Sequence, residues 1–260
     1  MSAGPLAGLG IVVTRPAHQA EALAQRITAA GGTPILFPAL EVVDLPDLQA
    51  LQAIIERLEQ FDLAIFISPN AVNKAMNLIR ARREWPPTLT IATIGKGSRK
   101  ALAAFGVTEV LVPAQRFDSE GLLETAPLQS VQGKRIVIFR GDGGRELLGD
   151  ELMRRGARVE YAECYRRQKP DTDSSDLRYR WARGEVHAVT IASSETLHNF
   201  YDLIGKLGQQ WLVKTPLFVP HERIAAAARA MGLGQVIVTP SGDDGLLQGL
   251  IEWGATQKNG

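Results

Sequence analysis

The sequence predicts an α/β protein made of two related units, each with a parallel β-sheet covered by helices on both faces. First, residues 8–42 resemble residues 133–167 at a constant offset of 125, and residues 64–76 resemble 189–201 at the same offset. Second, short β-branched runs alternate with segments whose apolar residues recur at the helical period. A repeat this long indicates a duplicated domain, and alternating strands and helices are typical of the doubly wound class.

In the first copy, five short apolar segments are predicted to be strands. They lack a clean alternation of apolar and polar residues, as expected when helices cover both faces of a sheet. The predicted strands span residues 11–14, 34–37, 62–67, 90–94 and 109–112.

The segment between the first two strands is predicted to be a helix. Its apolar residues Ala20, Leu23, Ala24 and Ile27 fall on one face, and a Gly-Gly pair follows at 31–32. Apolar residues at this spacing form the buried stripe of a helix, and glycine is common just after a helix end.

Composition and charge exclude several classes of protein. The 260 residues suffice for one large domain or two smaller ones, and the apolar and charged contents are ordinary for a globular chain. The net charge of +1 gives no support to a nucleic-acid or membrane-surface partner. The basic clusters at 80–83 and 166–169 are interpreted as solvated surface.

Cysteine content and hydropathy favour a cytoplasmic protein. Cys164 is the only cysteine, so no internal disulfide can form, which suits a reducing compartment. No apolar run reaches the roughly 18 residues of a membrane helix. The apolar part of residues 1–16 is expected to form the first strand and not a signal peptide.

Ligands of open parallel sheets bind beyond the carboxyl ends of the strands, where helix N-termini present amide groups. The turns predicted at those ends carry small, hydroxyl-bearing or cationic side chains, which suit carboxylates or phosphates. For any single turn, ordinary helix capping is the alternative. The candidate binding residues are Arg15, Ser68, Asn70, Gly95, Lys96, Gly97, Ser98, Arg140, Ser193, Ser194, His221 and Arg223.

The established catalytic motifs are absent from the sequence. The segment GKGSRK at 95–100 does not fit a dinucleotide fingerprint, QGKRI at 132–136 is not a P-loop, and HERIA at 221–225 is not a zinc motif. Cys164 is interpreted as a buried filler more than as a nucleophile. The segment RGDGGRE at 140–146 either cradles an anion or forms a glycine-rich turn. The four scattered histidines and the one cysteine give no metal-ligand spacing.

Tyr165 breaks the symmetry between the two copies. At the offset of 125 it stands opposite Leu40, and both lie where a predicted strand continues into an extended segment. Two such segments can pair and join two domains, and a phenol there would face the space between them. The alternative is an aromatic ring that packs beneath a linker.

Together, the duplicated α/β units, FISPNAV (66–72), IGKGSRKALAAFG (94–106) and ECYRR (163–167) resemble the uroporphyrinogen-III synthase family over essentially the whole chain. The resemblance implies two flavodoxin-like domains, in which the chain leaves the first domain early and later returns to it. One domain would then be 1–37 plus 170–260 and the other 43–160, joined by a two-stranded β-ladder of 38–42 and 161–169.

The resemblance also implies an activity that needs no metal and no organic cofactor. The expected substrate is hydroxymethylbilane, a linear tetrapyrrole with eight carboxylates, which is cyclised with inversion of its last pyrrole ring. Tyr165 matches the tyrosine of the family's cleft and is predicted to assist as a general acid. SSETL at 193–197 and VPHERIAAAA at 219–228 depart from the turns of many relatives.

Two other classes compete with this interpretation. A two-lobed cytosolic binding or sensor protein for a small polyanion would show the same duplication and hinge. A nucleotide-dependent transferase is disfavoured by the missing glycine fingerprints. We expect a monomer with no nucleic-acid or membrane partner, and the resemblance leaves open a transient contact with the upstream enzyme that forms the bilane.

Overall fold

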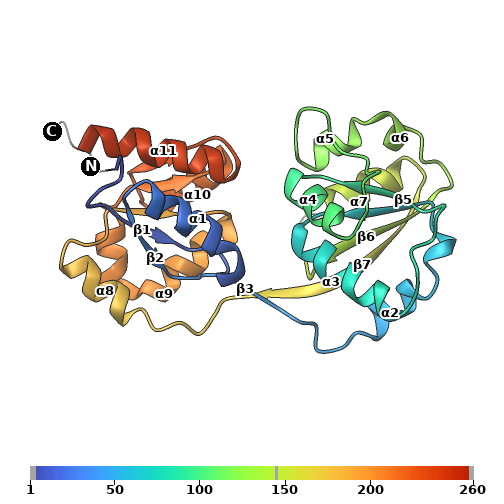
Figure 1. The fold of residues 1–260 in the computed structure, drawn as a ribbon, viewed down its shortest axis with the longest axis horizontal. Coiled ribbons are helices and arrows are strands. Elements are labelled where there is room, and N and C mark those ends of the chain that lie inside the picture. Colours follow the sequence, from blue (N-terminus) through green and yellow to red (C-terminus); the bar gives the residue numbers. More distant parts are fainter. Residues whose placement is uncertain (1–3, 144–145, 258–260) are drawn as a thin grey trace. The chain divides into compact units, whose positions relative to one another are not determined.

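The computed structural model describes residues 4–143 and 146–257, which form two compact α/β units (Figure 1). Unit 1 combines the described parts of Met1–Glu41 and Gln168–Gly260, and unit 2 is Val42–Arg167. The chain therefore leaves unit 1 after its first two strands, builds unit 2 and then returns. Among the described residues, no helix has the length and apolar character needed to cross a membrane.

The described residues of unit 1 form a five-stranded sheet with the order β10-β9-β8-β1-β2, in which every pair is parallel. Numbered along this unit alone, the order is 2-1-3-4-5, as in flavodoxin-like sheets. Its elements are β1 (Gly10–Val13), α1 (Ala17–Ala29), β2 (Thr33–Leu36), α8 (Ser175–Ala182), β8 (Ala188–Thr190), α9 (Ser194–Leu212), β9 (Leu217–Val219), α10 (Glu222–Ala230), β10 (Val236–Val238) and α11 (Gly242–Gln257).

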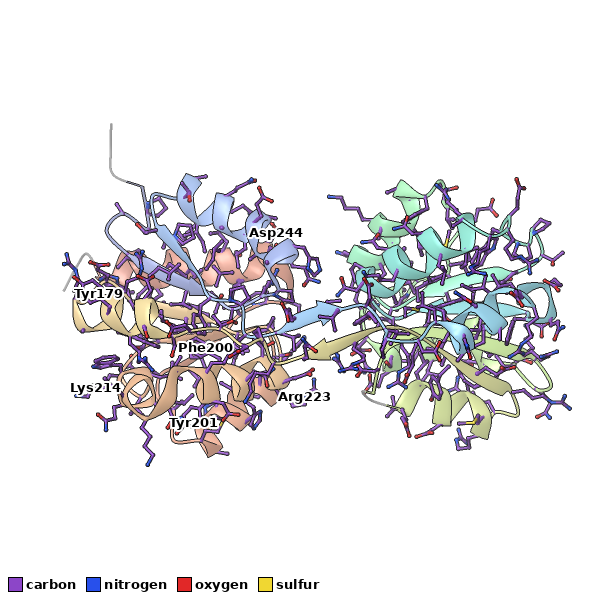
Figure 2. The ribbon with its side chains drawn as sticks, turned by 90° about the horizontal axis from the view of Figure 1, so that it is seen from below. Tyr179, Phe200, Tyr201, Lys214, Arg223 and Asp244 are labelled. Atoms are coloured by element: carbon purple, nitrogen blue, oxygen red, sulfur yellow. The ribbon has the colours of Figure 1, made fainter. Side chains whose placement is uncertain are left out.

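Helices cover both faces of this sheet, which explains the continuous apolar runs of its strands. On one face, α1 and α11 pack with Leu23, Ile27 and Leu250. On the other face, α8, α9 and α10 surround Phe200, whose ring lies in the interior of the unit (Figure 2). The apolar stripe predicted for the first helix is buried at Leu23 and Ile27, so this prediction is confirmed.

In the described part of the chain, the sheet of unit 2 has the strand order β3-β7-β6-β4-β5. Its strands β7, β6, β4 and β5 pair in parallel. Its elements are β3 (Glu41–Val43), which begins at the boundary between the units, α2 (Gln49–Ile55), the short 3₁₀ helix η1 (Leu58–Gln60), β4 (Leu63–Phe66), α3 (Pro69–Arg80), β5 (Thr90–Thr93), α4 (Lys96–Ala104), α5 (Ser119–Leu123), α6 (Ala126–Gln129), β6 (Arg135–Gly141), α7 (Leu147–Arg154) and β7 (Arg158–Gln168).

Two apolar clusters hold unit 2 together, one on each face of its sheet. One cluster includes α2, α3 and α4 and the stacked rings of Phe66 and Phe139, whose centroids lie 4.7 Å apart. The other includes α5, α6 and α7. The helices that follow β4 and β6 thus lie on opposite faces, which places the switch point of this sheet between these two neighbouring strands.

The strand predicted over 109–112 is wrong. Among the described residues, only Leu111 forms a bridge there, an isolated one to Ala92 of β5. Pro113 has no N–H to donate, so the pairing cannot continue beyond Leu111 on the C-terminal side.

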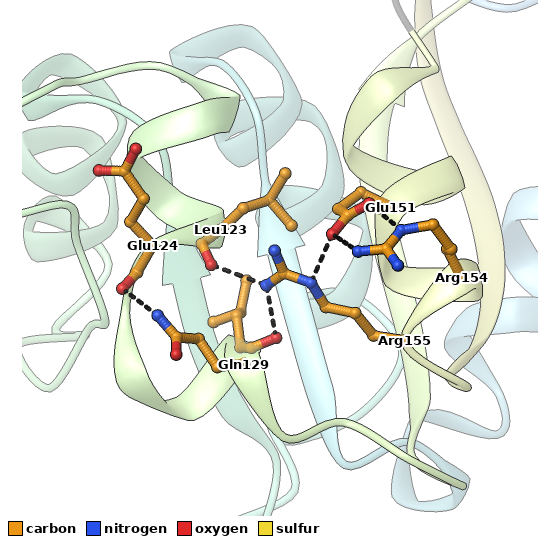
Figure 3. Close-up of polar contacts among 7 residues, drawn as sticks. Leu123, Glu124, Gln129, Glu151, Arg154 and Arg155 are labelled. Atoms are coloured by element: carbon orange, nitrogen blue, oxygen red, sulfur yellow. Dashed lines mark hydrogen bonds and ion pairs between the residues drawn. The ribbon is translucent and has the colours of Figure 1, made fainter.

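Arg155 ties the C-terminal end of α7 to α5 and α6 (Figure 3). Its guanidinium donates to the carbonyl oxygens of Leu123 and Leu128, at 2.7 and 3.0 Å, and to the Glu151 carboxylate at 2.7 Å. Arg154 donates to the same carboxylate. The hydrogen bonds from Arg154 and then from Arg155 lower the pKa of Glu151 from 4.5 to about 2.

Replacing Glu151 with glutamine is expected to lower the free energy of unfolding at neutral pH. Because the folded-state pKa lies below the unfolded value, the contribution of this carboxylate is present above about pH 4.5 and disappears towards about pH 2. Denaturant unfolding across this range should show the difference from wild type shrinking with acidity. Glu109→Gln, which changes an exposed carboxylate of the same unit, is the control. A difference that stays constant with pH would contradict the assignment.

Candidate active site

The first turns of α3 and α4 lie side by side at the carboxyl end of the unit 2 sheet. Ser68 caps α3, because its Oγ accepts a hydrogen bond from Ala71 N at 3.1 Å. A Cβ built on Gly97, in the first turn of α4, would lie 3.2 Å from Cγ of Pro69, the first residue of α3. Two helix N-termini therefore point amide groups at the same region.

The first turn of α4 has no side-chain cap. Gly95 occupies the cap position in an extended conformation, with φ −146° and ψ 152°, and brings no side chain that could accept from the amides of 96–98. Such amides and the partial positive charge of a helix N-terminus favour a carboxylate or phosphate. This turn is therefore a candidate anion-binding feature of unit 2.

The other predicted residues of these two turns differ in exposure. Asn70 is half-buried in the first turn of α3, Ser98 is buried, and Lys96 is exposed. The ammonium of Lys96 lies 4.8 Å from the centroid of the Phe117 ring, which is 43% exposed. A cation and an exposed aromatic face thus border the open amides.

Tyr165 reaches the same place from β7. Its side chain is buried among the apolar residues of the α2–α3–α4 face, and its hydroxyl lies 3.0 Å from Ser68 Oγ. A phenolic O–H at this helix N-terminus can donate a proton or a hydrogen bond to a bound ligand. The structure therefore brings Tyr165 together with Ser68 in unit 2.

Arg140 lies at the same end of the sheet but turns into its own loop. It is buried, its Nε donates to Gly141 O at 3.2 Å, another guanidinium N–H donates to Gly143 O, and the guanidinium lies over the Tyr161 ring. These contacts stabilise the turn after β6. Residues 144 and 145 of the segment RGDGGRE lie outside the described residues.

The carboxyl end of the unit 1 sheet shows a related arrangement. Ser193 caps α9 by accepting from Thr196 N at 3.0 Å, as Ser68 caps α3, and Ser194 is the first helical residue. His221 precedes α10 in an extended conformation and its side chain does not cap that helix. Each unit therefore pairs a serine-capped helix with a helix that lacks a side-chain cap.

The two predicted arginines of this end differ in their surroundings. Arg15 follows β1 and forms an ion pair with Asp243, at the start of α11, beside a small cavity bordered by Thr190 and Pro220. Arg223 is exposed on α10 (Figure 2), and His221, which precedes that helix, is exposed as well. Arg15 is thus already neutralised by a neighbour.

Two residues of the unit 2 site were missed by the sequence analysis. The sequence predicts a turn at Gly141, but β6 continues through this residue, which pairs with Tyr165. Phe117 lies in an irregular segment where no periodicity marks it. Knowledge of the strand order would have been needed to find Gly141, and no sequence signal pointed to Phe117.

The surroundings of Cys164 do not suit a nucleophile. It is buried, its Sγ donates to Ala162 O at 3.2 Å, and burial raises the pKa of the thiol from 9.0 to about 12. The described residues contain no group of three or more His, Cys, Asp or Glu side chains that could hold a metal ion.

We expect Cys164 to resist iodoacetamide in the native protein at about pH 8, because the thiolate is the reactive form and the thiol stays protonated there. Mass spectrometry should detect one alkylated cysteine only after unfolding in guanidinium chloride. Rapid alkylation of the folded protein would contradict the assignment.

Comparisons with known proteins agree with one another. A family model described as "Uroporphyrinogen-III synthase HemD" matches residues 21–247. The uroporphyrinogen-III synthases of Salmonella typhimurium (strain LT2) and of Escherichia coli (strain K12) are each 35% identical to this chain over 245 residues, covering 93% of it and 100% of the relative.

Two solved structures resemble the whole chain. A mutant uroporphyrinogen III synthase of the extremely thermophilic bacterium Thermus thermophilus matches with a TM-score of 0.65 and 20% identity, covering 96% of this chain and 99% of that one. Uroporphyrinogen-III synthetase of Helicobacter pylori 26695 matches with a TM-score of 0.60 and 15% identity, at the same coverage. At these identities they support the α/β fold with parallel sheets.

Proposed function

The chain belongs to the uroporphyrinogen-III synthase family, and from this premise we propose that it cyclises hydroxymethylbilane to uroporphyrinogen III with loss of water. The observation that carries the proposal is the Tyr165 hydroxyl, 3.0 Å from Ser68 Oγ at the end of the sheet where α4 begins without a side-chain cap. This combination offers anion binding and a proton donor in one place.

The carboxylates of the substrate are proposed to bind to backbone amides. The first turn of α4 in unit 2 and the first turn of α10 in unit 1 have no side-chain cap, so their amides can bind acetate or propionate groups. A net charge of +1 is compatible with a polyanionic substrate, because oriented amides supply positive potential locally. Lys96, His221 and Arg223 would add exposed cationic or polar contacts at these turns.

The reaction needs little acid–base chemistry from the protein. The nitrogen of the first pyrrole expels the terminal hydroxyl, which takes a proton from Tyr165 and leaves as water. The last ring then attacks the resulting azafulvene through its substituted carbon and forms a spiro intermediate, which fragments and closes the other way round. On closure, the free carbon of that ring loses a proton, which replaces the one given up by Tyr165, so the net change is the loss of one water.

The main task of the protein is therefore positioning. Spontaneous closure gives the uninverted isomer, so binding must bend the chain and fix which carbon attacks. Oriented binding of this kind can contribute as much as about 7–11 kcal/mol. General-acid assistance by Tyr165 adds about 10²–10⁴-fold, or less when the hydroxyl leaves readily.

The domain arrangement forms part of the same proposal. We propose domains of 1–37 plus 170–260 and of 43–160, derived from one duplicated unit and joined by a ladder of 38–42 and 161–169. The equivalent caps at Ser68 and Ser193 support the duplication. The chain crossings next to Glu41 and Arg167, and the adjacency of β3 and β7 in the sheet order, support the ladder.

Incubation with freshly prepared hydroxymethylbilane, followed by chromatographic separation of the product isomers, tests the activity. We expect the inverted isomer, formed faster than the spontaneous reaction. If only the uninverted isomer forms, at the uncatalysed rate, the proposal fails and the interpretation as a polyanion-binding protein is left standing.

A further inference from the structure

Tyr165 and Ser68 meet although their strands are not neighbours. β6 lies between β7, which carries Tyr165, and β4, which ends just before Ser68. Adjacent strands are about 4.8 Å apart, so roughly twice that distance separates β7 from β4. The phenol ring must therefore extend across β6 to place its hydroxyl 3.0 Å from Ser68 Oγ.

Gly141 is the residue of β6 that the ring crosses. A Cβ built on Gly141 would lie 2.5 Å from Cε2, 2.7 Å from Cζ and 3.1 Å from Cδ2 of Tyr165. Gly141 does not have a positive φ, so the backbone at this position could accept an alanine. The requirement for glycine comes from the ring that lies on it.

An irregularity in β7 aims the ring in this direction. Arg140 pairs with Glu163 and the next residue, Gly141, pairs with Tyr165, so the register shifts by one residue at Cys164. Such bulges re-aim a side chain and are frequent beside active sites.

Asp142 fixes the backbone of this irregular segment. Its N–H donates to Tyr165 O at 2.8 Å, and its Oδ1 accepts from Arg167 N at 2.9 Å. Asp142, in the turn after β6, therefore holds both ends of the segment 165–167.

We infer that Gly141 is a positioning residue for the reaction: its missing side chain leaves the path across β6 along which Tyr165 reaches Ser68. Asp142 supports the same geometry through the backbone of 165–167. The inference rests on the proposed function, because it gives Gly141 its effect through the phenol of Tyr165. It concerns a residue that needs no contact with substrate.

The test is a double-mutant cycle of Gly141→Ala and Tyr165→Phe, measured with hydroxymethylbilane. Gly141→Ala is expected to lower kcat about 10- to 100-fold, as a misplacement of about 1 Å can, with KM unchanged within about twofold. In the Tyr165→Phe background, the same change should lower kcat by less than about twofold further. Two groups that act as one unit are non-additive in this way.

Gly149→Ala is the matched control. A Cβ on Gly149 would lie 1.9 Å from the hydroxyl of Tyr161, so this variant also crowds a tyrosine in unit 2 but at a different place. We expect a lower melting temperature with kcat near that of wild type. Circular dichroism on all variants separates loss of folding from loss of positioning.

A folded Gly141→Ala enzyme with wild-type kcat would overturn the inference, and so would full additivity with Tyr165→Phe. If Gly141→Ala does not fold, Asp142 provides the second test: Asp142→Ala should lower kcat, and Asp142→Asn, which keeps an Oδ1 acceptor for Arg167 N, should restore most of it. Equal kcat in both Asp142 variants would then overturn the inference. A wild-type protein that makes no inverted isomer would instead refute the proposed function.

Discussion

Replacing Gly95 with aspartate is expected to raise KM for hydroxymethylbilane about 10- to 100-fold without loss of stability. A Cβ at this position would meet no atom within 4 Å in the described structure, and the extended backbone is the conformation of a helix cap. Aspartate is a preferred cap, so its carboxylate should accept from the amides of the first turn of α4 and stabilise the helix by a few tenths of a kcal/mol relative to glycine.

The same carboxylate would occupy the amides proposed for the substrate and would repel its acid groups. A hydrogen bond to a charged group contributes about 1.5–3 kcal/mol, which corresponds to roughly one to two orders of magnitude in binding. KM should therefore rise while the melting temperature stays the same or rises slightly. A general disturbance of unit 2 would instead raise KM and lower the melting temperature.

Three controls sharpen this experiment. Gly95→Ala adds a methyl group without an acceptor, and Gly95→Asn adds a neutral acceptor, so KM should rise in the order Ala, Asn, Asp. Gly234→Asp places the same carboxylate in the loop between α10 and β10 of unit 1, where a Cβ also has open space, and it should leave KM unchanged. A wild-type KM in Gly95→Asp would show that these amides do not bind substrate.

Removing the hydroxyl of Tyr165 is expected to lower kcat about 10- to 100-fold while KM changes by less than about twofold. Phenylalanine keeps the buried ring on Gly141 and loses only the contact with Ser68 Oγ. Loss of one neutral hydrogen bond should lower the free energy of unfolding by about 1 kcal/mol. Ser68 still caps α3 in this variant, so the helix N-terminus stays in place.

Tyr161→Phe is the matched control for this substitution, because Tyr161 lies on the same strand. Its hydroxyl is buried and has no hydrogen-bond partner among the described residues, so its removal should leave kcat unchanged and should not lower stability. Single-turnover measurements with hydroxymethylbilane compare the two variants. Equal rates for Tyr165→Phe and wild type would remove the phenol from the mechanism.

Local features of the fold were predictable from the sequence, and non-local ones were not. The cap by Ser68 depends on residues three positions apart, and the predicted turn at 68–70 does begin a helix. The contact of Ser68 with Tyr165 joins residues 97 positions apart and depends on the strand order. Arg15 similarly finds Asp243 only when the two ends of unit 1 come together.

The wrong prediction of a strand over 109–112 also comes from a non-local requirement. The β-branched and apolar residues of that segment favour a strand locally, yet a strand needs a continuous partner. The proline at 113 ends the pairing after Leu111, which forms only an isolated bridge. Gly141 went unnoticed because its neighbours in sequence do not explain it, whereas the ring of Tyr165 does.

The order in which the chain visits its two units has a consequence for biosynthesis. Unit 2 is one continuous segment, so a nascent chain can complete it while the remainder is still on the ribosome. β1 has to wait for β8, and Val12 and Ile35, which face α8, α9 and α10, stay largely uncovered until those helices have been made. Premature termination near residue 167 would therefore release a complete unit 2 attached to an incomplete unit 1. The exposed apolar residues of that incomplete unit are the kind of surface that chaperones and proteases recognise.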